Sequence, residues 1–490
     1  LIRGFDGAGA KVRSGRMTAP DDVAPPAAQR RIFCNRTLNL RAIRAVGFDM
    51  DYTLVHYKTE VWERRAWERA RARLRERGWP VADLEFDANF VILGLTVDLQ
   101  LGNLVKATRF GYVTRAVHGT RLLEFDEQRE TYSRVAVDLR EPRWVFLNTL
   151  FSLSEALLYA QCVDLLDQGK LPTGIGYGEL YAIVRSAIDR THAEGDLKAE
   201  IIKAPDDFVE LDPELGQCLL DLKNAGKRLL LVTNSEWGYT CAMMRYALDP
   251  YLPGGTTWRE VFDLTVVRAR KPDFFTAHNP IFEVVDETGL LRPADEGVQQ
   301  GRAYLGGNAR LLEAHLGLSP EEILYVGDHL YSDVHVTKDL LRWRTALVVR
   351  DIEKEIVDVE AFRHKQAELS RLMADKEREE HVYSTLRLEL ERGGHQPADA
   401  DAGLLKERMS KTKSRLSSLD AQIAPLAEEA GTLFNSRWGL LMRSGLDKSY
   451  LARQLERYAD AYTSRVSNFL AYTPYVYLRA PRVSLPHDEA

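Results

Sequence analysis

Two aspartates at the end of an apolar run are the first candidates for chemistry in this sequence. Asp49 and Asp51 follow the run Ala45–Phe48 and are separated by one residue. In an extended chain, residues i and i+2 point to the same side, so the two carboxylates would lie close together and repel each other. A hard, oxygen-liganded cation such as Mg²⁺ would relieve that repulsion. Taken alone, however, the pair is more typical of an acidic turn after a strand.

Further polar residues that could act with this pair lie later in the chain. They are Thr233 and Asn234, Lys271, and Asp328 and Asp333. Pro272 restricts Lys271 to an extended conformation and so narrows where its ammonium can point. Considered singly, Lys271 is typical of an exposed loop lysine, and the two later acids are typical of a helix N-cap followed by a first-turn carboxylate.

As a set, these acids, hydroxyl and lysine suit phosphoryl transfer. A carboxylate can attack phosphorus and form an aspartyl-phosphate. A second carboxylate can protonate the leaving oxygen and later activate water. Mg²⁺ and the lysine would neutralise the phosphoryl oxygens. The whole constellation therefore indicates a phosphotransfer site more strongly than any single residue does.

The apolar runs that precede these residues must position them. The runs are short and continuous, and they cover residues 45–48, 229–232, 323–326 and 345–349. Such runs, separated by helical patterns, predict buried parallel strands of an α/β sheet. Ligands of such sheets bind beyond the carboxyl ends of the strands, so we expect the polar residues to line one crevice.

The spacing of the runs predicts how the chain is divided. Residues 59–204, between the first two runs, are far too many for a simple crossover, so a separate lobe must be inserted there. Residues 351–430 are rich in Glu, Lys, Arg, Leu and Ala, which predicts two antiparallel helices with a structural or assembly role. We expect five parts: a flexible segment 1–31, a core of 32–58 and 205–350, the inserted lobe 59–204, the hairpin 351–430, and a C-terminal segment 431–490 that packs on the core.

Composition excludes several classes of protein. The chain has 490 residues, of which 45% are hydrophobic and 28% charged, as in ordinary globular proteins. Its net charge of −6 argues against a general nucleic-acid binder. No run approaches the length of a membrane span, and the first 31 residues lack the apolar stretch of a secretory signal. Met17 is a candidate natural start. Four cysteines without a CxxC pair indicate reduced thiols and a cytoplasmic protein.

The order of the motifs resembles the haloacid dehalogenase (HAD) superfamily of phosphohydrolases. Over about residues 31–479 the local sequence resembles that of the cytosolic purine 5′-nucleotidase family. The matching sequences are FDMDYTL at 48–54, NTLF at 148–151, ARKPDFF at 269–275, GDH at 327–329 and RYAD at 457–460. The resemblance implies a HAD-like Rossmannoid core with a large inserted cap lobe that chooses the substrate.

The resemblance also implies a role for each residue of the constellation. Asp49 would be the nucleophile, and Asp51 the general acid/base that gives its main-chain carbonyl to Mg²⁺. Asp328 would be a side-chain metal ligand, with Asp333 supporting the metal site. The phosphate would be held by Thr233, Asn234 and Lys271.

A second set of residues would bind the nucleotide base. Arg185 and Asp189 share one face of a predicted helix, and spacing alone favours a surface ion pair of little energetic value. The resemblance instead implies a purine-binding segment that continues to His192 and Lys198, with Phe151 stacking on the base. An arginine can donate to O6 and N7 of hypoxanthine or guanine, whereas adenine carries a donor at position 6, so IMP and GMP are favoured over AMP.

Relatives from animals have a purine-nucleotide effector site, and the residues here that resemble it are Asn148, Gln454, Arg457 and Tyr458. The stretch 134–143 matches that site poorly. We therefore predict a Mg²⁺-dependent cytoplasmic 5′-nucleotidase that acts on nucleoside monophosphates, can also transfer the phosphate to a nucleoside, and forms a homo-oligomer such as a dimer or tetramer. The alternatives are a HAD phosphatase for another small phosphate ester and a non-catalytic assembly protein.

Overall fold

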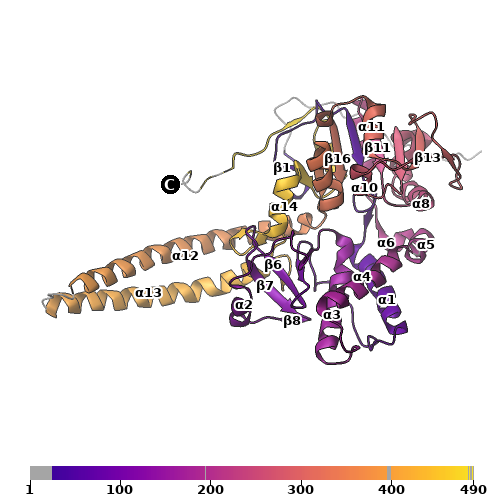
Figure 1. Ribbon diagram of the computed structural model, residues 1–490. Helices are drawn as coiled ribbons and strands as arrows, with labels where there is room; N and C mark the ends of the chain where they lie inside the picture. Colours follow the sequence, from indigo (N-terminus) through magenta and orange to yellow (C-terminus); the bar gives the residue numbers. More distant parts are fainter. Residues whose placement is uncertain (1–24, 194, 394–398, 484, 486–487, 489–490) are drawn as a thin grey trace, which may run out of the picture.

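A ten-stranded sheet forms the core domain in the computed structural model, at the upper right of Figure 1. The structure describes residues 25–193, 195–393, 399–483, 485 and 488. Seven neighbouring strands, from β20 to β15, run parallel, and antiparallel strands extend both edges. In order across the sheet the strands are β1 (Phe33–Cys34), β20 (Ala461–Thr463), β17 (Arg344–Val348), β16 (Ile323–Gly327), β3 (Ala45–Phe48), β11 (Arg228–Val232), β12 (Leu264–Val267), β15 (Arg302–Gly306), β13 (Ile281–Val284) and β14 (Leu291–Pro293).

Strand β3 is buried on both faces because side chains alternate across the sheet. Val46 and Phe48 pack in one cluster with α7 (Leu215–Asn224) and α8 (Trp237–Ala247). Ala45 packs in the opposite cluster. Helices α9 (Trp258–Val261), α10 (Asp273–Thr276) and α11 (Ala309–Leu316) complete the two layers. Parallel pairing of β3 with β11 and β16 places the residue after β3 in the middle of the carboxyl edge.

The inserted lobe lies between β3 and β11 and combines helices with a second, antiparallel sheet. The chain passes between core and lobe through a two-stranded ladder of β4 (His56–Tyr57) and β10 (Val209–Glu210). The lobe's helices are α1 (Thr59–Glu76), α2 (Phe125–Tyr132), α3 (Leu153–Asp167), α4 (Tyr177–Ala193), α5 (Asp196–Lys203) and α6 (Pro205–Phe208). Its strands, in sheet order, are β8 (Arg121–Leu122), β7 (Val113–His118), β6 (Asn103–Ala107), β5 (Thr96–Asp98) and β9 (Trp144–Phe146).

Two long helices project from the body as a hairpin (Figure 1). They are α12 (Ile352–Gly393) and α13 (Asp399–Thr432), which pack against each other along their length. The α/β fold class predicted from the sequence, with its inserted lobe and C-terminal helical pair, is thus confirmed. Residues 394–398, between the two helices, and residues 1–24 of the predicted flexible segment lie outside the described residues.

The segment after the hairpin contacts both the lobe and the core. The Trp438 indole donates a hydrogen bond of 2.7 Å to the Phe90 carbonyl in the lobe, and α14 (Tyr450–Tyr458) packs in the lobe's main apolar cluster. After α14, β20 joins the core sheet. Shorter ladders pair β18 (Arg443–Ser444) with β19 (Asp447–Lys448), and β2 (Leu38–Asn39) with β21 (Tyr477–Leu478).

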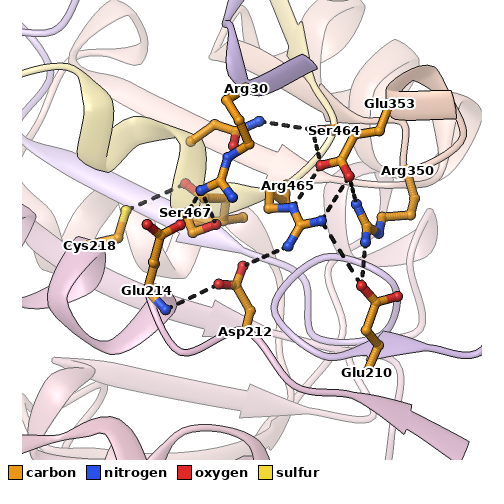
Figure 2. A network of polar contacts seen from close by, with 12 residues as sticks. Arg30, Glu210, Asp212, Glu214, Cys218, Arg350, Glu353, Ser464, Arg465 and Ser467 are labelled. Atoms are coloured by element: carbon orange, nitrogen blue, oxygen red, sulfur yellow. Dashed lines mark hydrogen bonds and ion pairs between the residues drawn. The ribbon is translucent and has the colours of Figure 1, made fainter. Parts of the chain in front are cut away.

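A polar network joins the lobe's linker to the base of the hairpin (Figure 2). The Arg465 guanidinium holds Glu353 of α12 through contacts of 2.7 and 2.8 Å, and Arg350 contacts both Glu353 and Glu210 of β10. Burial alone would raise the pKa of Glu353, but hydrogen bonds from Arg465 and Ser464 outweigh it and lower that pKa to about 2. Linker, hairpin and C-terminal segment are therefore held together by paired charges.

None of the helices in the described part of the chain has the length and apolar character needed to cross a membrane. The four cysteines, at positions 34, 162, 218 and 241, are all free thiols.

Gly47 of β3 leads to a prediction about stability. A Cβ atom at this position would lie 2.8 Å from the Tyr325 ring, so Gly47→Ala must push the ring or the strand aside. We expect the free energy of unfolding to fall by about 1–3 kcal/mol, as for other overpacked cores. Gly403→Ala is the matched control, since nothing lies within 4 Å of a Cβ there and α13 gains a better helix former. Urea unfolding curves that show equal changes for both variants would contradict the role of Gly47.

Candidate active site

Three aspartates converge at the carboxyl edge of the core sheet. Asp49 follows β3, Asp328 follows β16, and Asp333 lies in the π-helical segment Leu330–His335. One carboxylate oxygen from each lies within 4.8 Å of the others. Asp49 and Asp333 are buried and Asp328 is partly buried. The structure therefore brings together acids that are far apart in sequence, as strand-end positions require.

The segment after β16 is shaped to bring Asp333 back to the strand end. Asp333 Oδ2 accepts the His329 N–H at 3.1 Å, and the Asp333 N–H donates to the His329 carbonyl at 3.0 Å. A Cβ atom on Gly327 would lie only 2.5 Å from Asp333 Oδ2, so glycine is required for this close approach. The π-helical turn, a rare conformation often found at functional sites, accommodates the sharp return.

A buried lysine links two of these acids. The Lys271 Nζ lies 2.8 Å from Asp49 Oδ1 and 2.8 Å from Asp333 Oδ1, and it donates to the Tyr325 hydroxyl at 3.2 Å. Asn234 holds the lysine's backbone, because its Oδ1 accepts the Lys271 N–H at 2.6 Å and its Nδ2 donates to the Lys271 carbonyl at 3.2 Å. The structure thus places the Asn234 side chain on the lysine loop.

Thr233 lies at the end of β11 and is fully buried. Its N–H donates to the Val266 carbonyl of β12 at 2.9 Å, and its Oγ1 accepts the Ser235 N–H at 3.0 Å. A hydroxyl that accepts one hydrogen bond can still donate another, so Thr233 retains a donor suited to an oxyanion.

Asp51 lies apart from the three clustered acids. Its Oδ1 accepts the Tyr57 hydroxyl at 2.6 Å, and its Oδ2 accepts the Ser235 hydroxyl at 2.6 Å. Among the described residues, the group of side chains positioned to share a metal ion is Asp49, Asp328 and Asp333 without Asp51. Both oxygens of the Asp51 carboxylate are therefore engaged by the hydroxyls of Tyr57 and Ser235.

The cluster carries more negative charge than Lys271 can balance. Burial raises the pKa of Asp49 to about 7, although Lys271 opposes the rise. Burial also raises the pKa of Asp328 well above its usual range, and repulsion from Asp49 and Asp333 adds to the effect. Asp333 Oδ1 is buried, and its partner among the described residues is the Lys271 ammonium at 2.8 Å. An all-oxygen donor set with excess negative charge fits a hard divalent cation.

Two residues of the predicted base-binding set reach the site from the lobe. The Lys198 Nζ of α5 donates to Ser235 Oγ at 3.1 Å, directly beside Asp51. The Phe151 ring packs edge-on against Tyr52, with centroids 4.8 Å apart, and Tyr52 directly follows Asp51. The lobe therefore contributes a cation close to the second aspartate through Ser235, and an aromatic ring that packs on the neighbouring Tyr52.

The remaining residues of that set lie on α4. Arg185 and Asp189 form a pair at 3.9 Å, with side chains 54% and 68% exposed. Electrostatic partners of Arg185 are Tyr181, Glu155 and Asp189, all within the lobe. The backbone of His192 belongs to α4, and its side chain lies outside the described part of the structure. The pair thus resembles the surface ion pair that spacing alone favours.

The four predicted effector residues line a single cavity of about 800 Å³. It lies between the lobe and α14, and its wall includes Asn148, Gln454, Arg457 and Tyr458. The Tyr458 ring stacks on His335 with centroids 3.8 Å apart. Because His335 belongs to the same π-helical segment as Asp333, the cavity and the acid cluster share one element.

Sequence reasoning did not single out the two tyrosines nearest Asp51. Tyr57 contacts Asp51 directly, and its hydroxyl lies 2.9 Å from that of Tyr239. Neither belongs to a recognisable motif, and the signal available was only that Tyr239 follows the Thr233–Ser235 strand end by one helical turn. Ser235 was likewise not singled out, and its hydroxyl donates to Asp51.

Comparison with known proteins gives consistent matches over nearly the whole chain. A sequence model of the 5′ nucleotidase family matches residues 32–490. A 5′-nucleotidase domain-containing protein of Dictyostelium discoideum is 28% identical over 473 residues, which cover 93% of this chain and 74% of that protein. The 5′-nucleotidase domain-containing protein 2 of Rattus norvegicus is 27% identical over 480 residues, covering 93% and 80%.

The charge of the acid cluster predicts a response to metal. Adding Mg²⁺ to EDTA-treated protein should raise the melting temperature by a few degrees, because an ion that binds only the folded state stabilises it. Asp328→Asn should abolish most of that rise, whereas Asp420→Asn on the exposed hairpin should retain it. Differential scanning fluorimetry across a Mg²⁺ titration measures both. Equal shifts in the two variants would show that the ion binds elsewhere.

Proposed function

The chain belongs to the 5′ nucleotidase family, and from this premise we propose that it is a Mg²⁺-dependent phosphohydrolase of purine nucleoside monophosphates that works through an aspartyl-phosphate. The observation that carries the proposal is the Lys271 ammonium held between Asp49 and Asp333 at 2.8 Å from each. A buried cation beside a strand-end carboxylate is what a dianionic phosphoryl group requires. Family membership alone leaves the activity open, because the relatives' names state a domain and no substrate.

In the first step, Asp49 attacks phosphorus. Lys271 and the Met50 N–H both contact Asp49 Oδ1, at 2.8 and 2.7 Å, which leaves Oδ2 as the attacking oxygen. The bond from phosphorus to the ribose 5′ oxygen breaks as the aspartyl-phosphate forms. Asp51 gives its proton to the departing 5′ oxygen, and the nucleoside leaves.

In the second step, Asp51 takes a proton from water, which attacks phosphorus and releases Asp49 and inorganic phosphate. A nucleoside hydroxyl that takes the place of water would become phosphorylated, which accounts for the proposed phosphotransfer. Thr233 and Lys271 would hold the phosphoryl oxygens, and Asn234 supports them by fixing the lysine loop.

Mg²⁺ would be held by the carboxylates of Asp49 and Asp328, with Asp333 beside them. When bound, it would neutralise phosphoryl oxygens and the excess charge of the acid cluster. The Asp51 carboxylate is engaged by Tyr57 and Ser235, so a contribution from Asp51 through its main-chain carbonyl suits this geometry better than one through its side chain.

The purine preference rests on the lobe. Phe151, which packs against Tyr52, would stack on the base, and Arg185 would donate to the O6 and N7 acceptors of hypoxanthine and guanine. The 3.9 Å pair of Arg185 with Asp189 is loose and solvent-exposed, so the guanidinium can exchange that partner for a base at low energetic cost. IMP and GMP are therefore the proposed substrates, and another small phosphate ester is the alternative.

Regulation by a purine nucleotide is a second proposal, supported by the cavity beside α14. Arg453 and Arg457 line its wall and would attract an anionic ligand, whereas Arg140, also in the wall, is paired with Asp138. A ligand stacked near Tyr458 and His335 would touch the segment that carries Asp333. Occupancy of the cavity could thereby alter the position of an acid in the site.

A nucleotide panel tests the proposed activity. We expect phosphate release from IMP and GMP to exceed that from AMP, UMP and sugar phosphates, and EDTA to abolish it. Asp49→Asn should lower turnover by on the order of 10⁴–10⁶, as loss of a nucleophile does. Arg185→Ala should raise KM for IMP while leaving that for a sugar phosphate unchanged.

The panel has clear contrary outcomes. Equal rates on all esters would refute the purine preference and support a broader phosphatase. Activity that persists in EDTA would refute the metal requirement. Release of no phosphate from any ester, by protein with a normal melting curve, would favour the non-catalytic assembly protein.

The cavity prediction concerns the response to added nucleotide. Purine nucleoside triphosphates should change the rate of wild-type protein, and Arg457→Ala should lose that response while keeping its unstimulated rate within about threefold. Arg378→Ala on the exposed hairpin is the matched control and should respond as wild type does. An unchanged response in Arg457→Ala would rule out this cavity as the effector site.

A further inference from the structure

Two hydrogen-bonded relays converge on the Asp51 carboxylate, one on each oxygen. Tyr57 donates to Oδ1 at 2.6 Å, and the Tyr57 and Tyr239 hydroxyl oxygens are 2.9 Å apart. Ser235 donates to Oδ2 at 2.6 Å, and the Lys198 ammonium donates to Ser235 at 3.1 Å. Both oxygens of the carboxylate are therefore fixed by hydroxyl groups that are themselves held by a further side chain.

The direction of each hydrogen bond follows from the donor inventory. A phenol has one hydrogen, so when Tyr57 donates to Asp51 the hydrogen between the tyrosines must come from Tyr239. An ammonium has donors only, so Ser235 accepts from Lys198 and turns its own hydrogen toward Asp51. Lys198 and Tyr239 thus set the orientation of the two hydroxyls that touch the carboxylate.

The relays close into a ring, because the Lys198 Nζ lies 4.7 Å from the centre of the Tyr239 ring in a cation–π contact. The two tyrosines of the ring are buried, with Tyr57 2% and Tyr239 1% exposed, whereas Asp51 and Lys198 are partly exposed. Its members come from different parts of the fold. Ser235 and Tyr239 belong to the core, Tyr57 to the linker strand β4, and Lys198 to α5 of the lobe.

We propose that Tyr57 and Tyr239 are positioning residues that hold Asp51 in the orientation of a general acid, and that Lys198 of the inserted lobe completes the ring. This inference rests on the proposed function, in which Asp51 protonates the leaving 5′ oxygen. The two tyrosines act through Asp51 and are not themselves in contact with the reacting atoms.

Hydroxyl partners suit Asp51, which would act first as a general acid and then as a general base. Asp51 would give up a proton in the first step and take one in the second, so its partners must stay bonded to both the acid and the carboxylate form. A neutral hydroxyl can donate to either form of the carboxyl group, whereas the positive charge of arginine or lysine would favour the carboxylate throughout. The ring of hydroxyls can therefore keep the carboxyl group oriented through both steps.

Substrates with different leaving groups place different demands on a general acid. An alkoxide leaving group needs a proton, so its departure depends on a well-oriented general acid. A thiolate leaving group departs without one. In the bridging-sulfur analogue of a nucleoside monophosphate, sulfur replaces the 5′ oxygen while base, ribose and phosphate remain, so binding contacts are matched and the demand for the acid is removed.

The test compares kcat/KM for the best nucleotide of the panel and for its bridging-sulfur analogue. Because kcat/KM reports steps up to formation of the aspartyl-phosphate, it isolates the step that uses the acid. Tyr57→Phe should lower kcat/KM for the oxygen ester by about 10–100-fold and for the sulfur analogue by about threefold or less. Tyr239→Phe should show the same contrast with a smaller loss.

Tyr246→Phe is the matched control. It lies on the same helix as Tyr239 and also loses a phenol that contacts a carboxylate, that of Asp206, outside the ring. It should change neither rate. Melting curves of all variants verify that the folded state is retained.

The contrary outcomes are distinct. If Tyr57→Phe lowered kcat/KM equally for both substrates, Tyr57 would have a structural role and the inference would be overturned. No loss of kcat/KM for either substrate would also overturn it. In both cases the activity of the wild-type protein would still support the proposed function. If wild-type protein released phosphate from neither substrate, the proposed function would fail and the positioning role with it.

Discussion

The ion pair of Lys271 with Asp49 and Asp333 is the contact on which the rest of the site depends. The Lys271 side chain is only 2% exposed, and an unpaired charge at that depth would be strongly destabilising. The surrounding fold is arranged to keep the partners in reach. Glycines at positions 47 and 327 let Tyr325 and Asp333 approach β3 and β16, and Asn234 fastens the lysine loop. The remaining negative charge makes the cluster receptive to a cation.

The inserted lobe and its linker contribute contacts around the second aspartate, Asp51. Its linker strand β4 supplies Tyr57, and α5 supplies Lys198, so the contacts of Asp51 depend on how the lobe sits against the core. The other strand of the linker, β10, is held through Glu210 by arginines at the base of the hairpin and in the C-terminal segment (Figure 2). The lobe therefore contacts the surroundings of Asp51 directly, and the hairpin base and C-terminal segment contact the linker that joins the lobe to the core.

The parts of the site that could be predicted from sequence are those tied to strand ends. Asp49, Thr233 and Asp328 each follow a continuous apolar run, and the carboxyl ends of parallel strands meet at one edge, so their convergence follows from local pattern and sheet topology. Phosphoryl chemistry then follows from the residue types. Tyr57 and Tyr239 could not be found this way, because a phenol that meets a carboxylate through tertiary packing leaves no periodic or spacing signal.

The sequence by itself determined the α/β core, the position of the inserted lobe, the helical pair and the identity of the acids and lysine at the strand ends. Only the tertiary structure decided which acids share a cluster and which one stands apart, because that depends on side-chain directions set by neighbouring elements. Asp49 and Asp51 are two residues apart, yet one faces Lys271 and the other faces two hydroxyls. Local spacing determines proximity along the chain, whereas packing between distant segments determines the partners that give each carboxylate its chemistry.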